Sequence, residues 1–292
     1  MVGYERGQAA AEGGAEVERA LFARVAQAGR KGVSSGEGRV VAVSRSSDPR
    51  ISVVIPALNE AENLRYVLPR LPVDVDEVVL VDGNSTDDTV AVARGLLPGI
   101  RVLAQQGSGK GDALRTGFAA CTGEIIVMLD ADGSTDPAEI TRFVGALRAG
   151  ADFAKGSRFL AGGGTADMPL HRQLGNRGFV LLTRLLFGTR YSDLCYGYNA
   201  FWRDVLEQLR LTATGFEVEA MMNIRAHRVG LKIAEVPSFE HRRRYGQGRL
   251  KTFTDGWRVL KTILAERRDP QPAHAEFERQ AERVLDPLPE NV

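Results

Sequence analysis

Two aspartates separated by one residue, Asp130 and Asp132, follow a largely apolar run at residues 124–129. In an extended chain, residues i and i+2 point to the same face, so both carboxylates can reach one ion. Mg²⁺ and Mn²⁺ bind carboxylate oxygens and fill other positions with water and substrate phosphate. The pair therefore predicts a divalent metal bound to a diphosphate. The alternative is a turn at Asp132 and a helix cap at Asp136 without any metal, and the pair alone leaves both open.

The elements that would position this pair are alternating strands and helices between about residues 51 and 158. Apolar runs predict buried strands at 51–56, 77–82, 100–104, 124–129 and 151–157. Helical spacing predicts helices over 61–70, 89–97, 112–121 and 136–148. Asn59 with Glu62 indicates a capping box at the first helix, and Asp136 followed by Pro137 predicts the start of the last.

This alternation predicts an α/β fold with a mostly parallel sheet and helices on both faces. Ligands of such sheets bind beyond the carboxyl ends of the strands. Asp82, Asp130 and the turn at 56–59 all follow predicted strands. We therefore expect these residues at one edge of the sheet, around one site.

Length and composition indicate a single catalytic domain with tails. The chain has 292 residues, of which 43% are hydrophobic and 26% charged. We expect the domain at residues 49–268, a flexible extension at 1–48 and a flexible tail at 269–292. The formal net charge of +1 gives no reason to expect a nucleic-acid partner.

Cysteine usage and hydropathy predict the compartment. Cys121 and Cys195 have no CxxC spacing and no secretory signal precedes them, which indicates a cytoplasmic protein with inert thiols. No uninterrupted apolar stretch approaches the roughly 20 residues that span a bilayer. The longest, 179–187, is interrupted by Thr183 and Arg184.

Two other phosphate-binding motifs are incomplete. The glycine-rich turn at 107–112 resembles a P-loop, but Gly111 follows Lys110 where a Ser or Thr would bind magnesium. The glycines Gly107, Gly109 and Gly111 do not have the GxGxxG spacing of a dinucleotide site. The four histidines also form no zinc-binding or serine-nucleophile pattern.

Several motifs in a fixed order make the chain similar to a known family. They lie at residues 51–60, 81–89, 109–113, 129–133 and 156–158, and the similarity continues at 193–201, 215–219 and 236–246. As a set they resemble the glycosyltransferase family 2 enzymes, and in particular the branch of dolichyl-phosphate mannosyltransferases and polyprenyl-phosphate sugar transferases. The resemblance covers about residues 51–265.

The resemblance implies a GT-A fold, which is a Rossmann-like α/β arrangement. It also implies inverting transfer of a hexose from a UDP- or GDP-linked sugar, with Mg²⁺ or Mn²⁺ as cofactor. The departing nucleotide diphosphate develops negative charge as the glycosidic bond breaks. A metal together with Arg158 would stabilise that charge.

The resemblance assigns residues to the donor and the metal. Those expected at the nucleotide sugar are Pro56, Ala57, Asn59, Glu60, Asp82, Lys110 and Asp130. Asp132 would bind the metal directly, with Asp130 beside it. His241 is a further candidate ligand, as in some soluble relatives, whereas the lipid-phosphate branch tends to use a residue after the paired aspartates, here Ser134. Alternatively, Asn59 and Asp82 are cap and turn residues, Lys110 is a solvated charge, and His241 hydrogen-bonds a loop or a phosphate.

On the acceptor side, the resemblance gives catalytic roles to Arg158, Asp193, Glu217 and Glu219. A hydroxyl acceptor needs a general base, for which a carboxylate is suited, but a phosphate acceptor needs none. Glu217 and Glu219 also suit the N-terminus of a helix without a catalytic role. The arginines expected at an acceptor phosphate are Arg172, Arg242, Arg243, Arg244 and Arg249. A solvated basic surface is the alternative for these arginines.

The partners follow from these assignments but stay open in detail. A polyprenyl phosphate or another phosphate-bearing acceptor is favoured, with a soluble hydroxyl compound as the alternative, and a homodimer is also open. A nucleotidyltransferase or a non-catalytic nucleotide-sugar binder is an alternative of another class. Apolar residues at 257–264 beside basic ones suit either a helix on anionic lipid at the inner membrane face or a helix packed on the core.

Overall fold

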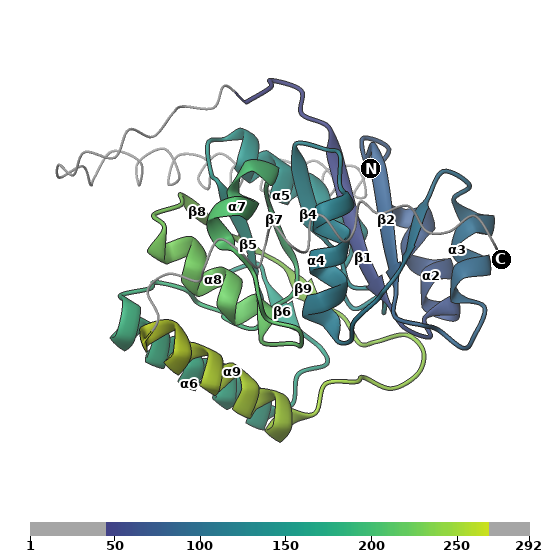
Figure 1. The fold of residues 1–292 in the computed structure, drawn as a ribbon. Coiled ribbons are helices and arrows are strands. Elements are labelled where there is room, and N and C mark those ends of the chain that lie inside the picture. Colours follow the sequence, from purple (N-terminus) through teal and green to yellow (C-terminus); the bar gives the residue numbers. More distant parts are fainter. Residues whose placement is uncertain (1–44, 269–292) are drawn as a thin grey trace, which may run out of the picture.

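The structure is a computed structural model that describes residues 45–268. Seven strands of this part form one sheet with the order β3-β2-β1-β4-β7-β5-β8 (Figure 1). Their bounds are β1 (Ile51–Ala57), β2 (Glu77–Asp82), β3 (Arg101–Ala104), β4 (Ile125–Met128), β5 (Phe153–Ser157), β7 (Asn199–Trp202) and β8 (Ile233–Pro237). The short strands β6 (Gly164–Thr165) and β9 (Phe239–Glu240) form a separate parallel pair.

The helices alternate with the strands in the first half and group together in the second. They are α2 (Ala61–Val67), α3 (Thr89–Leu96), α4 (Lys110–Ala120), α5 (Ile140–Arg148), α6 (Leu170–Phe187), α7 (Leu206–Leu209), α8 (Val218–Arg228) and α9 (Thr252–Arg268). Short 3-10 helices are η1 (Leu68–Arg70), η2 (Pro137–Glu139) and η3 (Arg203–Val205). The predicted extension at 1–48 and tail at 269–292 lie outside the described residues, apart from residues 45–48.

The first half of the sheet is parallel, as the alternating pattern predicts. β1 pairs with β2 and β4, and β2 pairs with β3, all in the parallel sense. Val53, Val54 and Ile55 of β1 are fully buried, because helices cover both faces and leave no strand face for polar residues. The five predicted strands are confirmed, and their ends differ from the prediction by two residues or fewer.

The structure confirms one predicted helix start and corrects another. Asp136 accepts a hydrogen bond from the backbone N–H of Ala138 at 3.1 Å, as an N-cap should. The capping box at Asn59 and Glu62 is wrong, since Asn59 has a φ of 55° and its side chain accepts a hydrogen bond from the backbone N–H of Thr86. The backbone N–H of Ala61, the first of α2, instead donates a hydrogen bond to the carboxylate of Asp87 in the neighbouring loop.

The second half of the sheet contains β7 and β8, which are not among the five strands predicted above. β7 lies between β4 and β5 and runs antiparallel to both. β5 then pairs in parallel with β8. The sheet of the described residues is therefore mostly parallel, as predicted, with β7 as its antiparallel member.

Three helices form a layer beside the C-terminal half of the sheet. α6 and α9 pack against each other and α8 packs against both, and α9 and α6 run along the lower edge in Figure 1. A second hydrophobic core joins this layer, centred on Leu194, Ile224, Val259 and Ile263. No helix in residues 45–268 has both the length and the apolar character to cross a membrane.

Candidate active site

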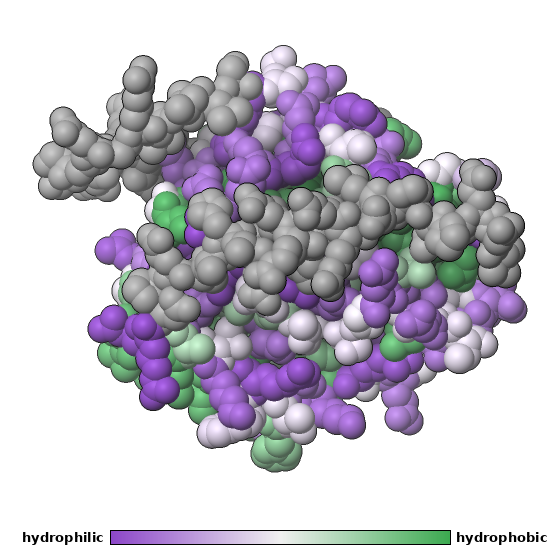
Figure 2. Space-filling model, viewed as in Figure 1, coloured by the Kyte–Doolittle hydropathy of each residue, from purple (hydrophilic) through white to green (hydrophobic). Residues whose placement is uncertain are grey.

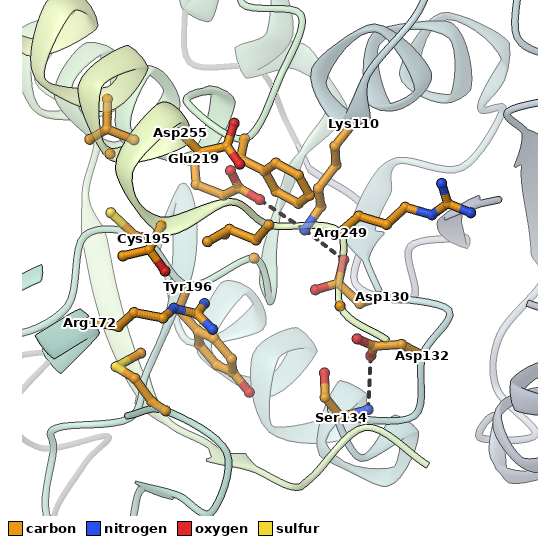
Figure 3. A pocket seen from close by; sticks show the side chains of 18 of the residues that line it. Lys110, Asp130, Asp132, Ser134, Arg172, Cys195, Tyr196, Glu219, Arg249 and Asp255 are labelled. Carbon is orange, nitrogen blue, oxygen red and sulfur yellow. Dashed lines mark hydrogen bonds and ion pairs between the residues drawn. The ribbon is translucent and has the colours of Figure 1, made fainter. Parts of the chain in front are cut away.

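A cleft of about 830 Å³ opens at the carboxyl ends of β1 and β4. One wall is formed by Pro56 and Ala57 at the end of β1 and by Glu60 just after it, and the floor by Asp130 and Asp132 after β4. The opposite wall comes from α6, α9 and the segment at 195–197. Figure 3 shows Arg172, Cys195 and Tyr196 facing the cleft from the side opposite the two aspartates.

Lys110 joins two acidic side chains in the cleft. Its Nζ atom lies 2.6 Å from Oδ1 of Asp130 and 2.9 Å from Oε1 of Glu219 (Figure 3). Burial alone would lower the pKa of Lys110, but the two carboxylates raise it above its ordinary value, so the ammonium stays charged. Burial raises the pKa of Glu219, although Lys110 opposes this effect. Lys110 is therefore neither a solvated charge nor remote from the paired aspartates.

The glycine-rich turn before α4 has a structural explanation. A Cβ atom at Gly111 would lie 2.4 Å from the carbonyl oxygen of Ala213, and one at Gly109 equally close to that of Thr214. Gly109 also has a φ of 90°, which a side chain disfavours. The glycines allow this turn to pack directly against the 213–214 backbone, which delivers Lys110 to the cleft.

Asp132 lies beside an arginine from a distant segment. Its Oδ1 atom accepts a hydrogen bond from the backbone N–H of Ser134 at 3.0 Å, and its Oδ2 atom lies 3.4 Å from Nη1 of Arg243. Nη2 of Arg243 contacts both carboxylate oxygens of Glu60, at 2.5 and 2.6 Å. Burial raises the pKa of Glu60, while Arg243 and Asn63 counteract it. Arg243 thus holds the segment at 241–250 to the cleft wall that contains Glu60.

The cleft offers oxygen ligands for a divalent metal, but no complete cage. Asp130 and Asp132 both line it. Within residues 45–268 there is no group of three or more His, Cys, Asp or Glu side chains that could hold a metal ion. Mg²⁺ or Mn²⁺ would therefore need diphosphate oxygens and water beside these carboxylates, which is how Mg²⁺ is usually bound with a phosphate substrate. The residues fit a metal that arrives together with a nucleotide diphosphate.

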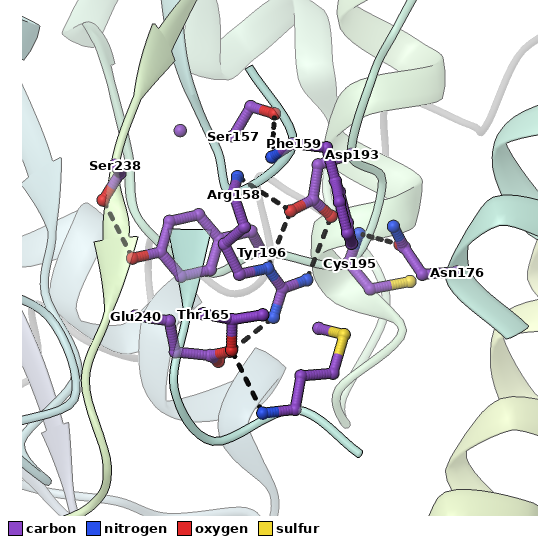
Figure 4. Close-up of polar contacts among 12 residues, drawn as sticks. Ser157, Arg158, Phe159, Thr165, Asn176, Asp193, Cys195, Tyr196, Ser238 and Glu240 are labelled. Carbon is purple, nitrogen blue, oxygen red and sulfur yellow. Dashed lines mark hydrogen bonds and ion pairs between the residues drawn. The ribbon is translucent and has the colours of Figure 1, made fainter. Parts of the chain in front are cut away.

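Arg158 forms a buried network at the back of the cleft (Figure 4). Its Nε and Nη2 atoms donate to Asp193 at 2.7 and 3.0 Å, and its Nη1 atom donates to Glu240 at 3.0 Å. Thr165 completes the network through a 2.6 Å hydrogen bond to Glu240, and the guanidinium lies 4.7 Å from the centre of the Tyr196 ring. Burial would raise the pKa of Asp193, but Arg158 holds it below its ordinary value. Arg158 lines the cleft, whereas Asp193 lies behind it.

The other residues assigned to the donor occupy the adjacent loops. Asp82 is nearly buried and accepts hydrogen bonds from the backbone N–H of Ser85 at 3.1 and 3.4 Å. The carboxylate of Asp82 therefore shapes the loop after β2, as Asn59 does through Thr86. Neither side chain is part of the cleft lining in the described residues. A role at the nucleotide stays a prediction for both.

The two glutamates before and within α8 differ in position. Glu219 points to Lys110 and lines the cleft, so it is more than a favourable charge at a helix N-terminus. Glu217 accepts a hydrogen bond from the backbone N–H of Gly215 and lies 3.8 Å from Arg258, outside the lining. Of the two, Glu219 is the one placed to meet a substrate.

The basic run after β9 does not act as one cluster. Arg243 and Arg249 line the cleft, as does Arg172 from α6. Arg242 donates to the carbonyl oxygen of Ala166, and Arg244 lies 3.5 Å above the ring of Tyr66.

His241 lies next to this basic run but outside the cleft lining. Its side chain is exposed, and its ring centre lies 4.9 Å from that of Phe239. The backbone N–H of His241 donates to the carbonyl oxygen of Ser134. Its role as a metal ligand stays a prediction.

Comparison with known proteins agrees with this geometry. The family model described as glycosyl transferase family 2 matches residues 52–210. The chain belongs to glycosyl transferase family 2. The matched residues contain β1 to β7, and therefore Lys110, both cleft aspartates and Arg158.

Two curated relatives are about one-third identical to this chain over the aligned residues. A polyprenol monophosphomannose synthase of Mycolicibacterium smegmatis is 34% identical over 64% of this chain and 76% of its own length. A low-salt glycan biosynthesis hexosyltransferase, Agl6, of Haloferax volcanii is 31% identical over 79% of this chain. The chain spans only 57% of the length of that archaeal relative.

A solved structure shows the same architecture. It is glucosyl-3-phosphoglycerate synthase from Mycobacterium tuberculosis in complex with Mn²⁺, UDP and phosphoglyceric acid. The two proteins superpose with a TM-score of 0.61 at 26% identity, over 76% of this chain and 80% of the other. The GT-A fold expected from the sequence is thereby confirmed.

Several cleft residues were not identified from the sequence. Gln105 lies just after β3 and donates to the carbonyl oxygen of Gly109 and to Asp112, which holds the glycine-rich turn. Its place at the end of a parallel strand was the available signal. Phe216 also lines the cleft. Cys195 does so as well, and burial together with Asp193 raises the pKa of its thiol to about 12, in line with the expected inert thiol.

Proposed function

We propose that this protein is an inverting, metal-dependent hexosyltransferase that uses a UDP- or GDP-linked sugar and a phosphate-bearing acceptor, with a polyprenyl phosphate preferred. One observation carries the proposal. Two aspartates after β4 and four arginines line a single cleft in a family 2 fold, the arginines being Arg158, Arg172, Arg243 and Arg249. Carboxylates suit a metal–diphosphate, and arginine forks suit a second phosphate.

On the donor side, Asp132 would hold Mg²⁺ or Mn²⁺ together with the diphosphate oxygens. The bound metal would act as a Lewis acid that stabilises the charge developing on the leaving diphosphate. Lys110 orients Asp130 through a 2.6 Å ion pair and keeps a positive charge beside it. Pro56 and Ala57 form the wall against which the nucleotide would lie.

On the acceptor side, the arginines of the lining favour an anionic nucleophile. A phosphate oxygen is already negative and needs no base to attack the anomeric carbon. Arg172 and Arg249 line the cleft from two separate segments and could bind such a phosphate. Arg158 lies deeper, where Asp193 and Glu240 fix its orientation. The polyprenol-phosphate relative described above supports a lipid-linked acceptor, which would bring the protein to the membrane surface as a peripheral enzyme.

A second candidate is transfer to a small phosphorylated acid. The solved relative that holds phosphoglyceric acid supports it, because the same cleft would need similar arginines. A neutral hydroxyl compound is a third acceptor class, for which Glu219, one of the carboxylates that line the cleft, could act as the general base.

The test combines donor binding with acceptor choice. UDP-, GDP- and TDP-sugars are screened by thermal shift with Mn²⁺, since a bound donor raises the melting temperature by mass action. The stabilising donor is then incubated with a short-chain polyprenyl phosphate, with the matching polyprenol and with 3-phosphoglycerate. We expect release of nucleoside diphosphate with the polyprenyl phosphate and none with the polyprenol. Release of pyrophosphate from a nucleoside triphosphate and a sugar 1-phosphate, in a separate incubation, would indicate a nucleotidyltransferase. Turnover with the polyprenol would contradict a phosphate acceptor.

A further inference from the structure

Two neighbouring helices expose a series of large apolar side chains. On α6 these are Leu170, Leu174, Leu181 and Leu185, and on α9 they are Phe253, Trp257 and Leu264. We call these seven residues the apolar strip. Single exposed leucines are common on soluble proteins, but a series on two packed helices marks an interaction surface. Figure 2 shows apolar and polar side chains interleaved at the lower left, where α6 and α9 lie in the same view of Figure 1.

The strip is only one face of the two helices. Val259 and Ile263 of α9 point the other way and pack into the second hydrophobic core. The interpretation of the 257–264 segment as a helix packed on the core is therefore confirmed for this face. Phe253 is 90% exposed and Leu185 is 74% exposed, whereas other apolar residues of the same two helices are buried in the second hydrophobic core or pack against it. The exposed side chains are thus in excess of what packing requires.

The charges beside the strip all have the same sign. The exposed charged side chains of α6 and α9 are Arg177, Arg184, Arg258, Lys261, Arg267 and Arg268. α6 contains no acidic residue, and both acids of α9 are buried. Glu266 pairs with Arg225 and Arg228, and Asp255 accepts a hydrogen bond from the backbone N–H of Lys251. The exposed charged side chains of these two helices are therefore all basic, although the net charge of the chain is only +1.

The apolar strip also borders the cleft. Phe253 and Trp257 belong to both, and Gly175 and Phe179 of α6 line the cleft between the two helices. With the strip facing the lipid, a lipid-linked phosphate would enter the cleft beside these residues, on the side where Arg172 lies. An orientation with the strip against lipid would therefore also place the mouth of the cleft beside the lipid.

We infer that α6 and α9 dock flat on an anionic bilayer through the apolar strip. This inference rests on the proposed function, because a lipid-linked acceptor gives the docking its role. Apolar side chains would enter the interfacial region, and Trp257 suits the headgroup level with its amphipathic ring. The arginines and lysine beside them would extend toward lipid phosphates. Each basic side chain near such a surface strengthens binding roughly fivefold. The orientation places the cleft mouth at the membrane.

Tryptophan fluorescence tests the contact directly. The chain has two tryptophans, and Trp202 is buried and bonded to the carbonyl oxygen of Ala151, so Trp257 reports on the strip. Full-length protein is mixed with vesicles of phosphatidylcholine alone or with roughly 30% phosphatidylglycerol, prepared with brominated acyl chains. We expect quenching and co-sedimentation only with the anionic vesicles, about tenfold stronger than with neutral ones. The Trp257→Phe variant should still sediment but lose the quenching.

Paired variants locate the surface. The double variant Leu181→Glu/Leu185→Glu changes two residues of the strip that do not line the cleft. It should weaken vesicle binding at least about tenfold. Val73→Glu with Leu96→Glu, at exposed positions near η1 and in α3, should leave it unchanged. Both pairs should keep the donor-induced thermal shift, which separates a failed docking surface from a failed transferase.

Three results would overturn the inference. The first is equal vesicle binding by the two variant pairs. The second is the absence of quenching of the wild-type protein by brominated anionic vesicles, which decides the matter even if the strip variant fails to fold. The third is a lipid-free dimer in sedimentation velocity that the strip variant dissociates, because the strip would then bind a second copy of the chain.

Discussion

Two arginines at the cleft each bridge two acidic side chains, but in different surroundings. Arg158 binds Asp193 and Glu240, and the Arg158 and Asp193 side chains are 3% and 0% exposed. Arg243 binds Glu60 and approaches Asp132, and the side chains of Arg243 and Asp132 are 14% and 25% exposed. The first network follows a strand of the sheet, whereas the second reaches over from a segment without regular structure.

The difference in exposure indicates that the Arg158–Asp193 pair stabilises the folded protein, whereas the Arg243–Asp132 pair can separate and let Asp132 bind another partner. Removing one partner of a buried pair leaves an uncompensated charge in a medium of low dielectric, which is strongly destabilising. A pair open to water loses little when it separates, because solvent replaces the partner. We therefore expect Asp193 to matter for stability and Asp132 for activity, since a metal can take the place of Arg243.

The largest effect is expected for Asp132→Asn. Loss of the carboxylate charge should lower the turnover number about a thousandfold or more, since metal stabilisation of the transition state contributes several kcal/mol. The free energy of unfolding should change by less than about 0.5 kcal/mol. Turnover is measured on EDTA-treated protein titrated with Mn²⁺, with Asp136→Asn as a control that keeps a capping side chain outside the cleft. Near-normal turnover of Asp132→Asn would refute the metal assignment.

For Asp193→Asn we expect the main effect on the free energy of unfolding rather than on turnover. The variant leaves Arg158 buried with Glu240 as its remaining acidic partner, and should lose about 3 kcal/mol of unfolding free energy. Urea denaturation monitored by circular dichroism measures it. A loss below about 1 kcal/mol would mean that the buried network is as exchangeable as the Arg243 contacts.

A smaller effect should separate two neighbouring arginines. Arg243→Ala is expected to raise the acceptor KM about tenfold, and more than the donor KM, because a metal that replaces Arg243 at Asp132 frees its guanidinium for an acceptor phosphate in the cleft. Arg244→Ala is the matched control and should change the acceptor KM less than about twofold, since its guanidinium stacks on Tyr66. Equal changes in donor and acceptor KM for Arg243→Ala would show that it does not discriminate between the substrates.

The smallest effect is a difference in pH dependence. The pKa of Asp193 is held below its ordinary 3.8, so its contribution to stability is complete above that pH and is lost as the pH falls through the folded-state value. The pKa of Glu60 is raised above 4.5, so its carboxylate lowers stability as the pH rises through that raised value. Unfolding free energies between about pH 3 and 7 should therefore show a steeper rise with pH for Glu60→Gln than for the wild type. Parallel profiles would contradict the raised pKa of Glu60.

The sequence by itself determined the parallel half of the fold and much of the site. Strands β1 to β5 were predicted because helices cover both sheet faces and leave nearly continuous apolar runs. Asp136 and Pro137 marked a helix start through contacts within three residues. Asp130 and Asp132 were located because the carboxyl ends of parallel strands meet at one edge. Each of these inferences depends on local pattern or on the geometry of one strand.

Only the tertiary structure decided which charges meet. Lys110 and Glu219 are 109 residues apart, and Arg243 and Glu60 are 183 apart, so no local pattern indicates their pairing. The same holds for β7, whose insertion between β4 and β5 depends on partners distant in the chain. Asn59 could cap a helix, but the loop after β2 offered a stronger alternative in the folded protein. Local propensities are weak, and packing of distant segments chooses among them because it removes the most apolar surface from water.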